Sequence, residues 1–438
     1  MESQIGKISI IGSGYVGTVS AACFAELGHD IICIDVDEEK VRQINAAIPP
    51  IYEEGLEDLL KKHVGKNLQA TSDYDYAIKN SDISFICVGT PSGDDGSIDL
   101  SIIRAASASL GRAIANKGTY HVVVVKSTVV PQTTENVVLP IIEEYSNKRA
   151  GVDFGIAMNP EFLREGKAVY DFMHPDKIVV GAIDERSGDA VSQLYQSLDC
   201  EITRTDPKTA EMIKYVNNSF LATKISFSNE IGNICKKLGI DTYEVMQAVG
   251  KDFRISPSFL NSGAGFGGSC FPKDVKALIG KAKEINYSPI LLESVVKVNE
   301  QQPLRMVELL NDKIGSVKGK QIAVLGLAFK NDTDDIRESR SIPILAKLLQ
   351  LGAKVTAYDP MAADNMKRIY GADKIKYCDN ALNALTGADA CLVMTEWAEF
   401  KNLDFEFGVM KHRIVIDGRH MIQADKLQQD IDYIGLCW

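Results

Sequence analysis

The sequence lacks closely spaced pairs of cysteines. Its 438 residues include 9 cysteines, an odd number, and they are scattered without a Cys-x-x-Cys pair. A disulfide framework or a zinc site needs closely and regularly spaced cysteines. In a chain this long, the scatter is typical of a reducing compartment. We expect no signal peptide, because the first predicted strand begins within a few residues of Met1. We therefore expect a cytoplasmic protein.

Long apolar runs, an excess of positive charge and clustered histidines are also missing. Apolar runs are short, as at Val122–Val125, and none approaches the roughly 20 residues of a membrane helix. The formal net charge of −11 disfavours nonspecific nucleic-acid binding, although a local basic pocket for a phosphate is compatible with it. The 6 histidines are dispersed, without a zinc pattern or a local Ser-His-Asp set. We expect no metal, no membrane and no nucleic-acid partner.

What is present begins with a strand, a glycine turn, a helix and a second strand. Lys7–Ile11 is a predicted buried strand, the turn 12–17 reads Gly-Ser-Gly-Tyr-Val-Gly, and Val19–Leu27 is a predicted helix. Asp30–Ile34 is the next predicted strand and ends at Asp35. The three glycines make the tight turn, admit a pyrophosphate and pack helix against strand. An acid about 20 residues further on accepts hydrogen bonds from a ribose diol and repels a 2′-phosphate. The pattern predicts NAD, rather than NADP, as cofactor.

A similar rhythm returns near the end of the chain. Gln321–Leu325 and Lys354–Tyr358 are predicted strands on either side of a predicted helix, Ser341–Leu351. Their turn, Gly326–Lys330, lacks the three-glycine pattern, so we expect no second dinucleotide there. The predicted fold class is α/β, with two Rossmann-like doubly wound domains joined by a long helix and a helical central domain. The predicted bounds are 1–205, 206–314 and 315–438.

The central segment is helical in pattern. Asp206 and Pro207 form a helix start, with an N-cap followed by proline at the first position. From Lys208 to Leu238 an approximate apolar face is traced by Met212, Val216, Phe220, Ile225, Ile231, Ile234 and Leu238. Such a helix is suited to bridging domains and pairing with a second subunit. A further helical stretch is predicted over Ile290–Ile314.

Residues 265–274, Gly-Phe-Gly-Gly-Ser-Cys-Phe-Pro-Lys-Asp, are the most informative stretch. Pro272 suits the first position of a helix, which places Cys270 at the helix N-terminus. Free N–H groups and the helix dipole favour a thiolate there. Asp274 follows four residues on and lies close to Cys270 if the helix forms. This layout favours an activated sulfur nucleophile over a buried structural cysteine.

Other candidate groups are weaker on spacing alone. Lys214 and Asn218 share one face of the long helix and suit donation to an oxyanion, although such a pair is usually solvated. Glu161 and Glu165 bracket a short apolar-basic segment, and one of them suits a general base, although surface charge is the commoner explanation. Arg254 alone indicates nothing.

Together these residues resemble the UDP-glucose/GDP-mannose dehydrogenase family over almost the whole length. The matching motifs are the turn 12–17 with Asp35, Gly89-Thr90-Pro91, Lys126-Ser127-Thr128, 159–166, 214–218, 265–274, 327–330 with 333–335, 395–397 and 417–419. Within the family, Phe271 after the cysteine resembles the UDP-glucose branch, because GDP-mannose members tend to carry leucine there. The same chemistry on GDP-mannose or a UDP-N-acetylhexosamine remains the alternative. Asn261 departs from members that carry lysine there.

The resemblance implies a four-electron oxidation of a nucleotide sugar, from primary alcohol to carboxylate, with two NAD+. It implies Cys270 as nucleophile, Lys214 and Asn218 as oxyanion donors, and Asp274 as a neighbouring carboxylate. For the thioester-hydrolysing water it implies Glu165, Glu161 or Thr128, and of these we favour Glu165. The implied NAD site comprises Gly12, Gly14, Tyr15, Val16, Gly17, Asp35, Lys40, Thr90, Pro91 and Thr128. The implied substrate site comprises Phe162, Leu163, Arg254, Phe259, Phe266, Gly267, Lys330, Arg337 and Arg419.

The resemblance also implies that Arg254 reaches a neighbouring subunit's site, so a homodimer or higher homo-oligomer is expected. Two other functions compete with this reading. A simple two-electron dehydrogenase would form one NADH per sugar and would not need Cys270. An NAD-binding regulator would bind the cofactor without turnover.

Overall fold

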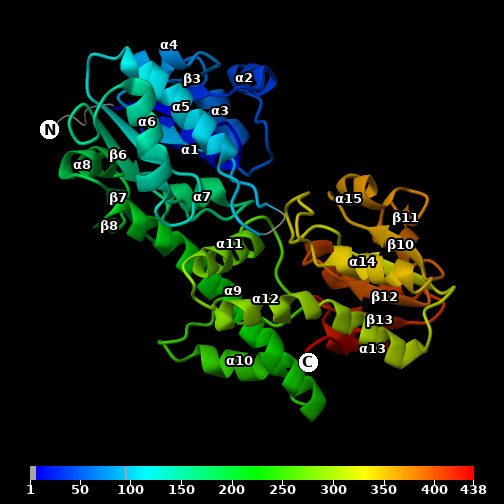
Figure 1. Ribbon diagram of the computed structural model, residues 1–438. Helices are drawn as coiled ribbons and strands as arrows, with labels where there is room; N and C mark the ends of the chain where they lie inside the picture. The colour runs from blue at the N-terminus through cyan, green and yellow to red at the C-terminus, as the bar shows by residue number, and fades with distance from the viewer. Residues whose placement is uncertain (1–5, 94–95) are drawn as a thin grey trace. The chain divides into compact units, whose positions relative to one another are not determined.

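The computed structural model describes residues 6–93 and 96–438 (Figure 1). The chain divides into two compact units, Met1–Val216 and Asn217–Trp438, and the division falls within the long helix α9, Pro207–Leu238. Each unit contains one twisted sheet with helices packed on it, so the predicted α/β class is confirmed.

The first unit contains an 8-stranded sheet in the order β3-β2-β1-β4-β5-β6-β7-β8. Its strands are β1 Lys7–Ile11, β2 Asp30–Ile34, β3 Leu68–Thr71, β4 Ile83–Ile86, β5 His121–Val125, β6 Phe154–Met158, β7 Ile178–Ala182 and β8 Ile202–Thr205. All neighbours are parallel except β6 and β7. The chain order reverses between β1 and β4, and ligands bind at the carboxyl ends of strands beside such a reversal. The glycine turn after β1 lies at this reversal.

The helices of the first unit cover both faces of this sheet. They are α1 Tyr15–Glu26, α2 Glu38–Asn45, α3 Leu56–His63, α4 Tyr74–Lys79, α5 Ser101–Ala115, the π-helix Thr134–Val138, α6 Leu139–Ser146, α7 Ala168–Met173 and α8 Glu185–Gln193. Helix α1 begins at Tyr15, not at Val19 as predicted. The Thr18 N–H donates to the Gly14 carbonyl at 3.0 Å, so the glycine turn itself closes the first helical bond. Its last residues therefore present helix N-terminal N–H groups.

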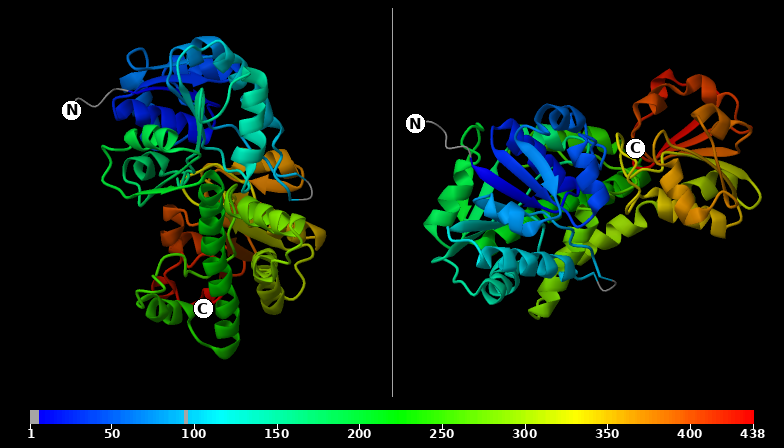
Figure 2. Two further views of the ribbon diagram at one scale, coloured as in Figure 1. Left: turned by 60° about the vertical axis from the view of Figure 1, so that its left-hand side comes forward. Right: turned by 90° about the horizontal axis from the view of Figure 1, so that it is seen from above.

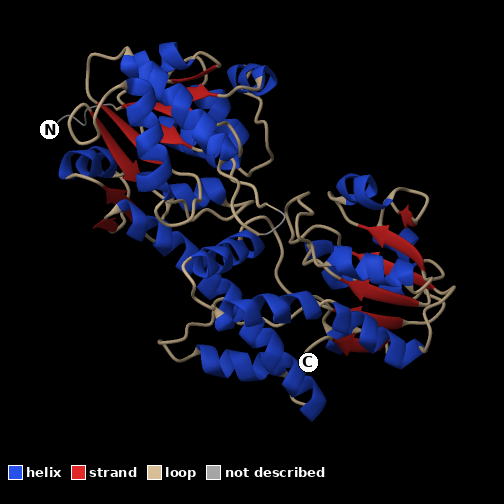
Figure 3. Cartoon of the chain, viewed as in Figure 1, coloured by secondary structure: helices blue, strands red, loops and turns tan. Residues whose placement is uncertain are grey.

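Residues 207–314, all of them described, contain helices and no strand (Figure 3). The helices are α9, α10 Thr242–Gly250, α11 Phe271–Glu284, α12 Ile290–Gln301 and α13 Leu304–Ile314. The prediction of a single helical stretch over Ile290–Ile314 is wrong, because the helix is interrupted at Gln302 and Pro303. Proline cannot donate the backbone bond that would carry the helix through. Within the described residues, no helix combines the length and apolarity needed to span a bilayer.

Helix α9 begins as predicted, with Asp206 accepting a hydrogen bond from the Thr209 N–H at 2.9 Å. It continues unbroken for 32 residues (Figure 2). Much of the predicted apolar face is exposed in the single chain. Of its members, Val216, Phe220, Ile234 and Leu238 are 52%, 62%, 50% and 68% exposed.

The second unit contains a 6-stranded sheet in the order β11-β10-β9-β12-β13-β14, with every pair parallel. Its strands are β9 Gln321–Leu325, β10 Lys354–Tyr358, β11 Ile375–Tyr377, β12 Ala390–Val393, β13 Ile414–Asp417 and β14 Asp432–Gly435. Its flanking helices are α14 Ser341–Gln350, α15 Ala363–Tyr370, α16 Ala381–Leu385 and α17 Asp404–Phe407, with short 3-10 turns at Ala398–Asn402 and Ala424–Lys426. The sheet packs on these helices and on α13 to form one apolar core.

Candidate active site

The first glycine turn is shaped to receive a dinucleotide. Gly12 has a φ of +93°, and a Cβ on Gly17 would lie 1.8 Å from the Gly12 carbonyl oxygen. Both positions therefore require glycine. A Cβ on Gly14 would meet nothing within 4 Å. That open space, beside the N-terminus of α1, fits the pyrophosphate of NAD.

Asp35 follows β2 and faces this turn. Its carboxylate accepts hydrogen bonds from the Ser13 N–H at 2.7 Å and the Ser13 hydroxyl at 2.6 Å. Half-burial opposes the charge, but Ser13, the Asp37 N–H and the Lys40 ammonium together lower the pKa of Asp35. The ionised, half-exposed carboxylate is fit to accept hydrogen bonds from a ribose diol.

The loops after β4 and β5 are tied together beside the turn. The Thr90 hydroxyl donates to the Thr128 carbonyl at 2.8 Å, and the Ser127 hydroxyl donates to the Val88 carbonyl at 2.7 Å. Thr90 is buried and Pro91 is exposed. The structure thus brings together three predicted cofactor residues, Thr90, Pro91 and Thr128, at the carboxyl edge of the sheet.

Glu161 and Lys214 form a buried ion pair. The Lys214 Nζ lies 2.8 Å from the Glu161 Oε1, and the two side chains are 4% and 8% exposed. The Leu163 N–H donates to the other carboxylate oxygen at 2.6 Å. Burial raises the pKa of Glu161, but Lys214, the Leu163 N–H and Lys126 outweigh it and lower the pKa overall. The Lys214 Nζ also lies 5.4 Å from the centre of the Phe162 ring.

Lys126 is a buried charged residue, and the sequence analysis names it only as part of the motif Lys126-Ser127-Thr128. Its Nζ donates to the Asn159 Oδ1 at 2.9 Å, and the Tyr195 hydroxyl donates to the same oxygen at 2.6 Å. Burial lowers the pKa of Lys126 to about 8, although Glu161 opposes the shift. Asn159 and Tyr195 thus hold Lys126 close enough to Glu161 for its charge to help lower the pKa of that carboxyl group.

Cys270 is placed as predicted, at the N-cap of α11, and it is exposed. Pro272 is the second residue of the helix rather than the first. The Asp274 N–H donates to the Cys270 carbonyl at 2.9 Å, which closes the first turn. The buried Asp274 carboxylate accepts a hydrogen bond from the Asn218 Nδ2 at 2.6 Å and lies 2.8 Å from the Lys273 Nζ. Asp274 and Asn218 therefore form one polar cluster one helical turn from the thiol.

The glycine loop before Cys270 is clamped from two sides. Asn299 of α12 accepts from the Phe266 N–H at 2.8 Å and donates to the Phe266 carbonyl at 3.0 Å. The Gly268 N–H donates to the Arg337 carbonyl at 2.9 Å. A Cβ on Gly267 would lie 2.4 Å from the Glu338 carbonyl oxygen. The loop that carries the nucleophile thus rests directly on the loop between β9 and α14.

All three of the predicted nucleotide-anchoring residues have contacts within the second unit. Arg337 is exposed and forks onto the Asp335 carboxylate at 2.6–2.9 Å. Arg419 donates to the Met394 and Gly265 carbonyls at 2.8 and 3.0 Å. The Lys330 Nζ lies 5.5 Å from the centre of the Phe329 ring. All three side chains belong to loops after strands, the region where such sheets bind ligands.

Arg254 and Phe259 lie in an exposed segment that follows α10. Arg254 forks onto Asp252 at 2.6–3.2 Å, and Phe259 is 38% exposed with a φ of +64°. This pair of side chains lies on the surface of the single chain.

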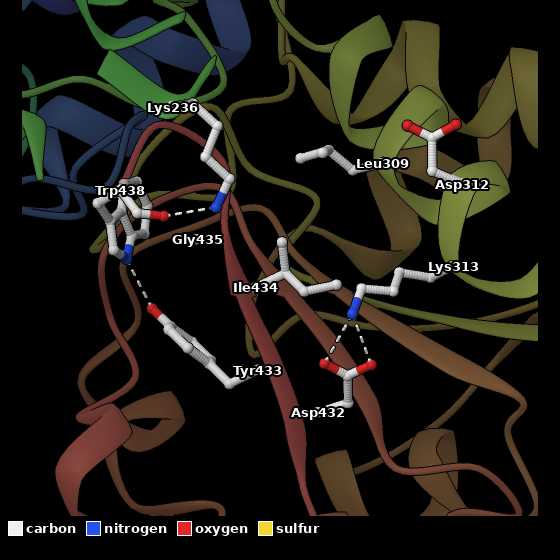
Figure 4. A pocket seen from close by; sticks show the side chains of 9 residues that line it. All are labelled: Lys236, Leu309, Asp312, Lys313, Asp432, Tyr433, Ile434, Gly435 and Trp438. Atoms are coloured by element: carbon white, nitrogen blue, oxygen red, sulfur yellow. Dashed lines mark hydrogen bonds and ion pairs between the residues drawn. The ribbon is translucent and has the colours of Figure 1, made fainter. Parts of the chain in front are cut away.

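A separate hollow of about 450 Å³ lies in the second unit (Figure 4). It is lined by Lys236, Leu309, Asp312, Lys313, Asp432, Tyr433, Ile434, Gly435 and Trp438. Lys313 pairs with Asp432 at 3.0 Å, and Lys236 donates to the Trp438 carbonyl at 2.6 Å. None of the predicted site residues lines this hollow, so it is distinct from the candidate site.

Comparisons with known proteins cover the whole chain. Sequence models of the UDP-glucose/GDP-mannose dehydrogenase family match as the NAD binding domain at residues 6–199, the central domain at 208–301 and the UDP binding domain at 323–424. The chain therefore belongs to the UDP-glucose/GDP-mannose dehydrogenase family.

Individual relatives are similar over their full length. The UDP-glucose 6-dehydrogenase of Haloferax volcanii is 50% identical, over 98% of this chain and 100% of that protein. The GDP-mannose 6-dehydrogenase of Pseudomonas savastanoi is 43% identical, over 99% and 100%. Among solved structures, the UDP-glucose dehydrogenase of Pyrobaculum islandicum matches with a TM-score of 0.94 at 41% identity, over 100% of this chain and 99% of that one.

Proposed function

We propose that this chain is an NAD-dependent UDP-glucose 6-dehydrogenase, which oxidises the C6 alcohol of UDP-glucose to the carboxylate of UDP-glucuronate. The observation that carries the proposal is the exposed thiol of Cys270 at the N-terminus of α11, above the Asn218–Asp274 cluster. The NAD-binding turn with Asp35 and the similarity to UDP-glucose 6-dehydrogenases support it.

NAD+, when bound at the first glycine turn, accepts a hydride in each of the two oxidations. The turn residues Gly12, Gly14, Tyr15, Val16 and Gly17 hold the pyrophosphate through backbone N–H groups. Asp35, with Lys40 beside it, would accept hydrogen bonds from the ribose diol, and Thr90, Pro91 and Thr128 would contribute to the rest of the cofactor site. We assign the dinucleotide-binding domain to residues 1–205.

Cys270 forms the covalent intermediate. Its sulfur adds to the aldehyde carbon left by the first oxidation, and the thiol proton passes to the aldehyde oxygen to give a thiohemiacetal. Loss of a hydride and the hydroxyl proton leaves a thioester. Water then breaks the carbon–sulfur bond, releasing the carboxylate and returning the thiol. Holding the aldehyde on sulfur prevents its escape between the two oxidations.

Lys214 and Asn218 are one helical turn apart on α9, and we assign both to the oxyanions that form at C6. A buried ammonium and a fixed carboxamide stabilise such charge more strongly than solvent does. We keep Glu165 as the base that activates the hydrolytic water, with Glu161 and Thr128 as its neighbours. The Glu161 carboxylate is ionised and held by Lys214, which suits it to orienting that lysine.

The remaining site residues bind the nucleotide sugar. We assign the sugar contacts to Phe162, Leu163, Phe259, Phe266 and Gly267, and the phosphate and uridine contacts to Lys330, Arg337 and Arg419. The central domain is assigned to residues 206–314 and the UDP-binding domain to 315–438.

We also infer a homodimer, formed in the cytoplasm, through the exposed face of α9. Phe220, Phe227 and Ile234 are at least half exposed and follow one another at intervals of seven residues. That spacing produces a continuous seam suited to a second α9. In the dimer, Arg254 would contact the second copy's substrate. Phe227→Glu should convert the dimer to a monomer in sedimentation equilibrium, and an unchanged dimer would contradict this surface.

The test of the function is the number of NADH molecules formed per nucleotide sugar at completion. UDP-glucose should yield two NADH, whereas GDP-mannose and UDP-N-acetylhexosamines should yield none. Cys270→Ser should lower kcat for the complete reaction by at least about 1,000-fold, because the nucleophile is removed. One NADH per sugar, or a fully active Cys270→Ser variant, would contradict the thioester route.

A further inference from the structure

Glu53 is a buried carboxylate that is not among the site residues assigned above. It lies in the loop between α2 and α3 and is 5% exposed. Its Oε2 accepts a hydrogen bond from the Gly166 N–H at 2.8 Å, and its Oε1 accepts one from the Ala168 N–H at 2.8 Å. The Tyr15 hydroxyl donates to the same carboxylate. All three of these donors are neutral.

These contacts join two segments of the candidate site. Tyr15 is the first residue of α1, directly after the open space at Gly14 where the pyrophosphate is received. Gly166 and Ala168 end the segment that begins with Glu161 and contains Glu165. The Gly166 N–H also lies 3.1 Å from the Tyr15 hydroxyl. Tyr15 and Glu53 therefore fasten the end of the glutamate segment to the beginning of α1.

The chemistry of the pair suits a fixed connection. Burial, the hydrogen bond to Glu53 and the nearby charges of Glu53 and Glu165 raise the pKa of Tyr15. The phenol therefore keeps its proton and remains a donor. Gly166 has a φ of +82°, so the segment turns sharply at the residue that Glu53 holds. Two backbone N–H groups directed at one buried carboxylate leave the turn little freedom.

The exposed side of the same segment has its own fastening. Arg164 donates to Asp171 through its backbone N–H at 2.8 Å and through its side chain at 2.6 and 2.9 Å. Glu165 thus lies between an outer anchor at Arg164 and an inner anchor at Gly166. The outer anchor is built within the segment and α7, whereas the inner one reaches the cofactor turn.

We propose that Glu53 is a positioning residue for thioester hydrolysis, which holds the segment 161–168 through Gly166 and Ala168 and couples it to the cofactor turn through Tyr15. This inference rests on the proposed function, because it needs Glu161 and Glu165 to act on the C6 intermediate. A catalytic base displaced by about 1 Å loses about 100-fold in rate. Glu53 would thus act on the rate through geometry, without touching the substrate.

The experiment compares Glu53→Gln with the wild-type enzyme in steady state and in a quenched reaction. A carboxamide offers a single acceptor oxygen, so one backbone N–H loses its partner. We expect kcat for UDP-glucose to fall about 10- to 100-fold, with KM values for UDP-glucose and NAD+ within about threefold. Because hydrolysis slows most, intact-protein mass spectrometry should find the acyl adduct on Cys270 in Glu53→Gln during turnover, but not in the wild type.

Two further variants keep the test decisive. Tyr15→Phe removes one hydroxyl and should also lower kcat, by a smaller factor. It provides the test if Glu53→Gln fails to fold. Glu57→Gln, at an exposed position paired with Lys61, is the matched control and should behave as wild type.

Wild-type kcat without an adduct in Glu53→Gln, or in Tyr15→Phe if only that variant folds, would overturn the proposal. So would loss of activity caused entirely by a higher KM for NAD+. If the wild type itself does not form two NADH per UDP-glucose, the proposed function fails instead, and the two failures are therefore distinguishable.

Discussion

The two glycine turns of this chain are built on the same plan but use their aspartates differently. Each turn follows the first strand of its unit, and each faces an aspartate at the end of the second strand. Asp35 bonds to Ser13 and Asp37 and stays half-exposed. Asp359 is 4% exposed. The first acid faces solvent as well as its turn, whereas the second is enclosed.

Asp359 is fully occupied by its own fold. One oxygen accepts from the Leu327 N–H, the Ala328 N–H and the Trp397 indole at 2.7–3.0 Å. The other accepts from the N–H groups of Met361 and Ala362 at 2.9 and 2.8 Å. Five donors leave no lone pair for a ribose diol. The expectation that the second turn binds no dinucleotide thus has a physical basis in addition to its missing glycines.

The largest effect expected of this comparison separates the two turns by their glycines. In Gly17→Ala the new Cβ would lie 1.8 Å from the Gly12 carbonyl oxygen, and in Gly326→Ala it would lie 2.5 Å from Thr395 at a φ of +96°. Gly17→Ala should weaken NAD+ binding by at least about 100-fold, because the backbone that meets the pyrophosphate must move. Gly326→Ala should lower stability but leave NAD+ affinity within about threefold. Calorimetric titration with NAD+ measures both.

A matched control is Gly28→Ala, because Gly28 also has a positive φ of +93° but a Cβ there would meet nothing within 4 Å. It measures the backbone strain alone. If Gly17→Ala bound NAD+ as well as Gly28→Ala does, the role of the first turn would be wrong.

The second prediction exchanges the two aspartates for asparagine. Asp359→Asn turns one acceptor oxygen into a donor facing N–H groups, which should lower the free energy of unfolding by about 3 kcal/mol. Asp35→Asn should cost little stability and should raise the relative use of NADP+ by about 10-fold, because the charge that repels a 2′-phosphate is removed.

The measurement is urea unfolding followed by circular dichroism, because both tryptophans, Trp397 and Trp438, lie in the second unit and would not report on the unit of Asp35. The transition should shift strongly for Asp359→Asn and little for Asp35→Asn. Equal shifts in the two variants would show that the aspartates do not differ in their structural roles.

The contrast between the two turns also shows which structural features can be predicted from the sequence. Several local features are predicted correctly: the turn with Asp35, the N-cap at Asp206 and the position of Cys270 each depend on residues close together in the chain. Long-range contacts are not predicted. Glu53 and Asn299 look like ordinary polar residues in a loop and a helix, and only tertiary contact shows which backbone groups they hold. The break at Pro303 was missed because apolar periodicity continues on both sides of it.

The smallest expected effect concerns one buried carboxylate in each unit. Glu211 accepts hydrogen bonds from the Gln132 N–H and from the N–H and hydroxyl of Thr134 at 2.6–2.8 Å, and burial raises its pKa to about 7. In the second unit, burial raises the pKa of Asp417 despite hydrogen bonds from the N–H groups of Arg419, Met421 and Ile422. Each native carboxylate therefore binds its proton more tightly than it does in the unfolded chain.

A raised native pKa stabilises the fold below the unfolded value near 4.5, and this contribution is lost as the pH rises through the native value. Between pH 5 and pH 7, Glu211 should therefore lower the free energy of unfolding by about 2 kcal/mol. Glu211→Gln should remove that slope, because glutamine does not titrate. Urea unfolding followed by circular dichroism at pH 5, 6 and 7 measures it, with Glu57→Gln as an exposed control. If Glu211→Gln kept the wild-type slope, another group would be responsible for the titration. Loss of the slope in Asp417→Asn would then identify that group as Asp417, in the second unit.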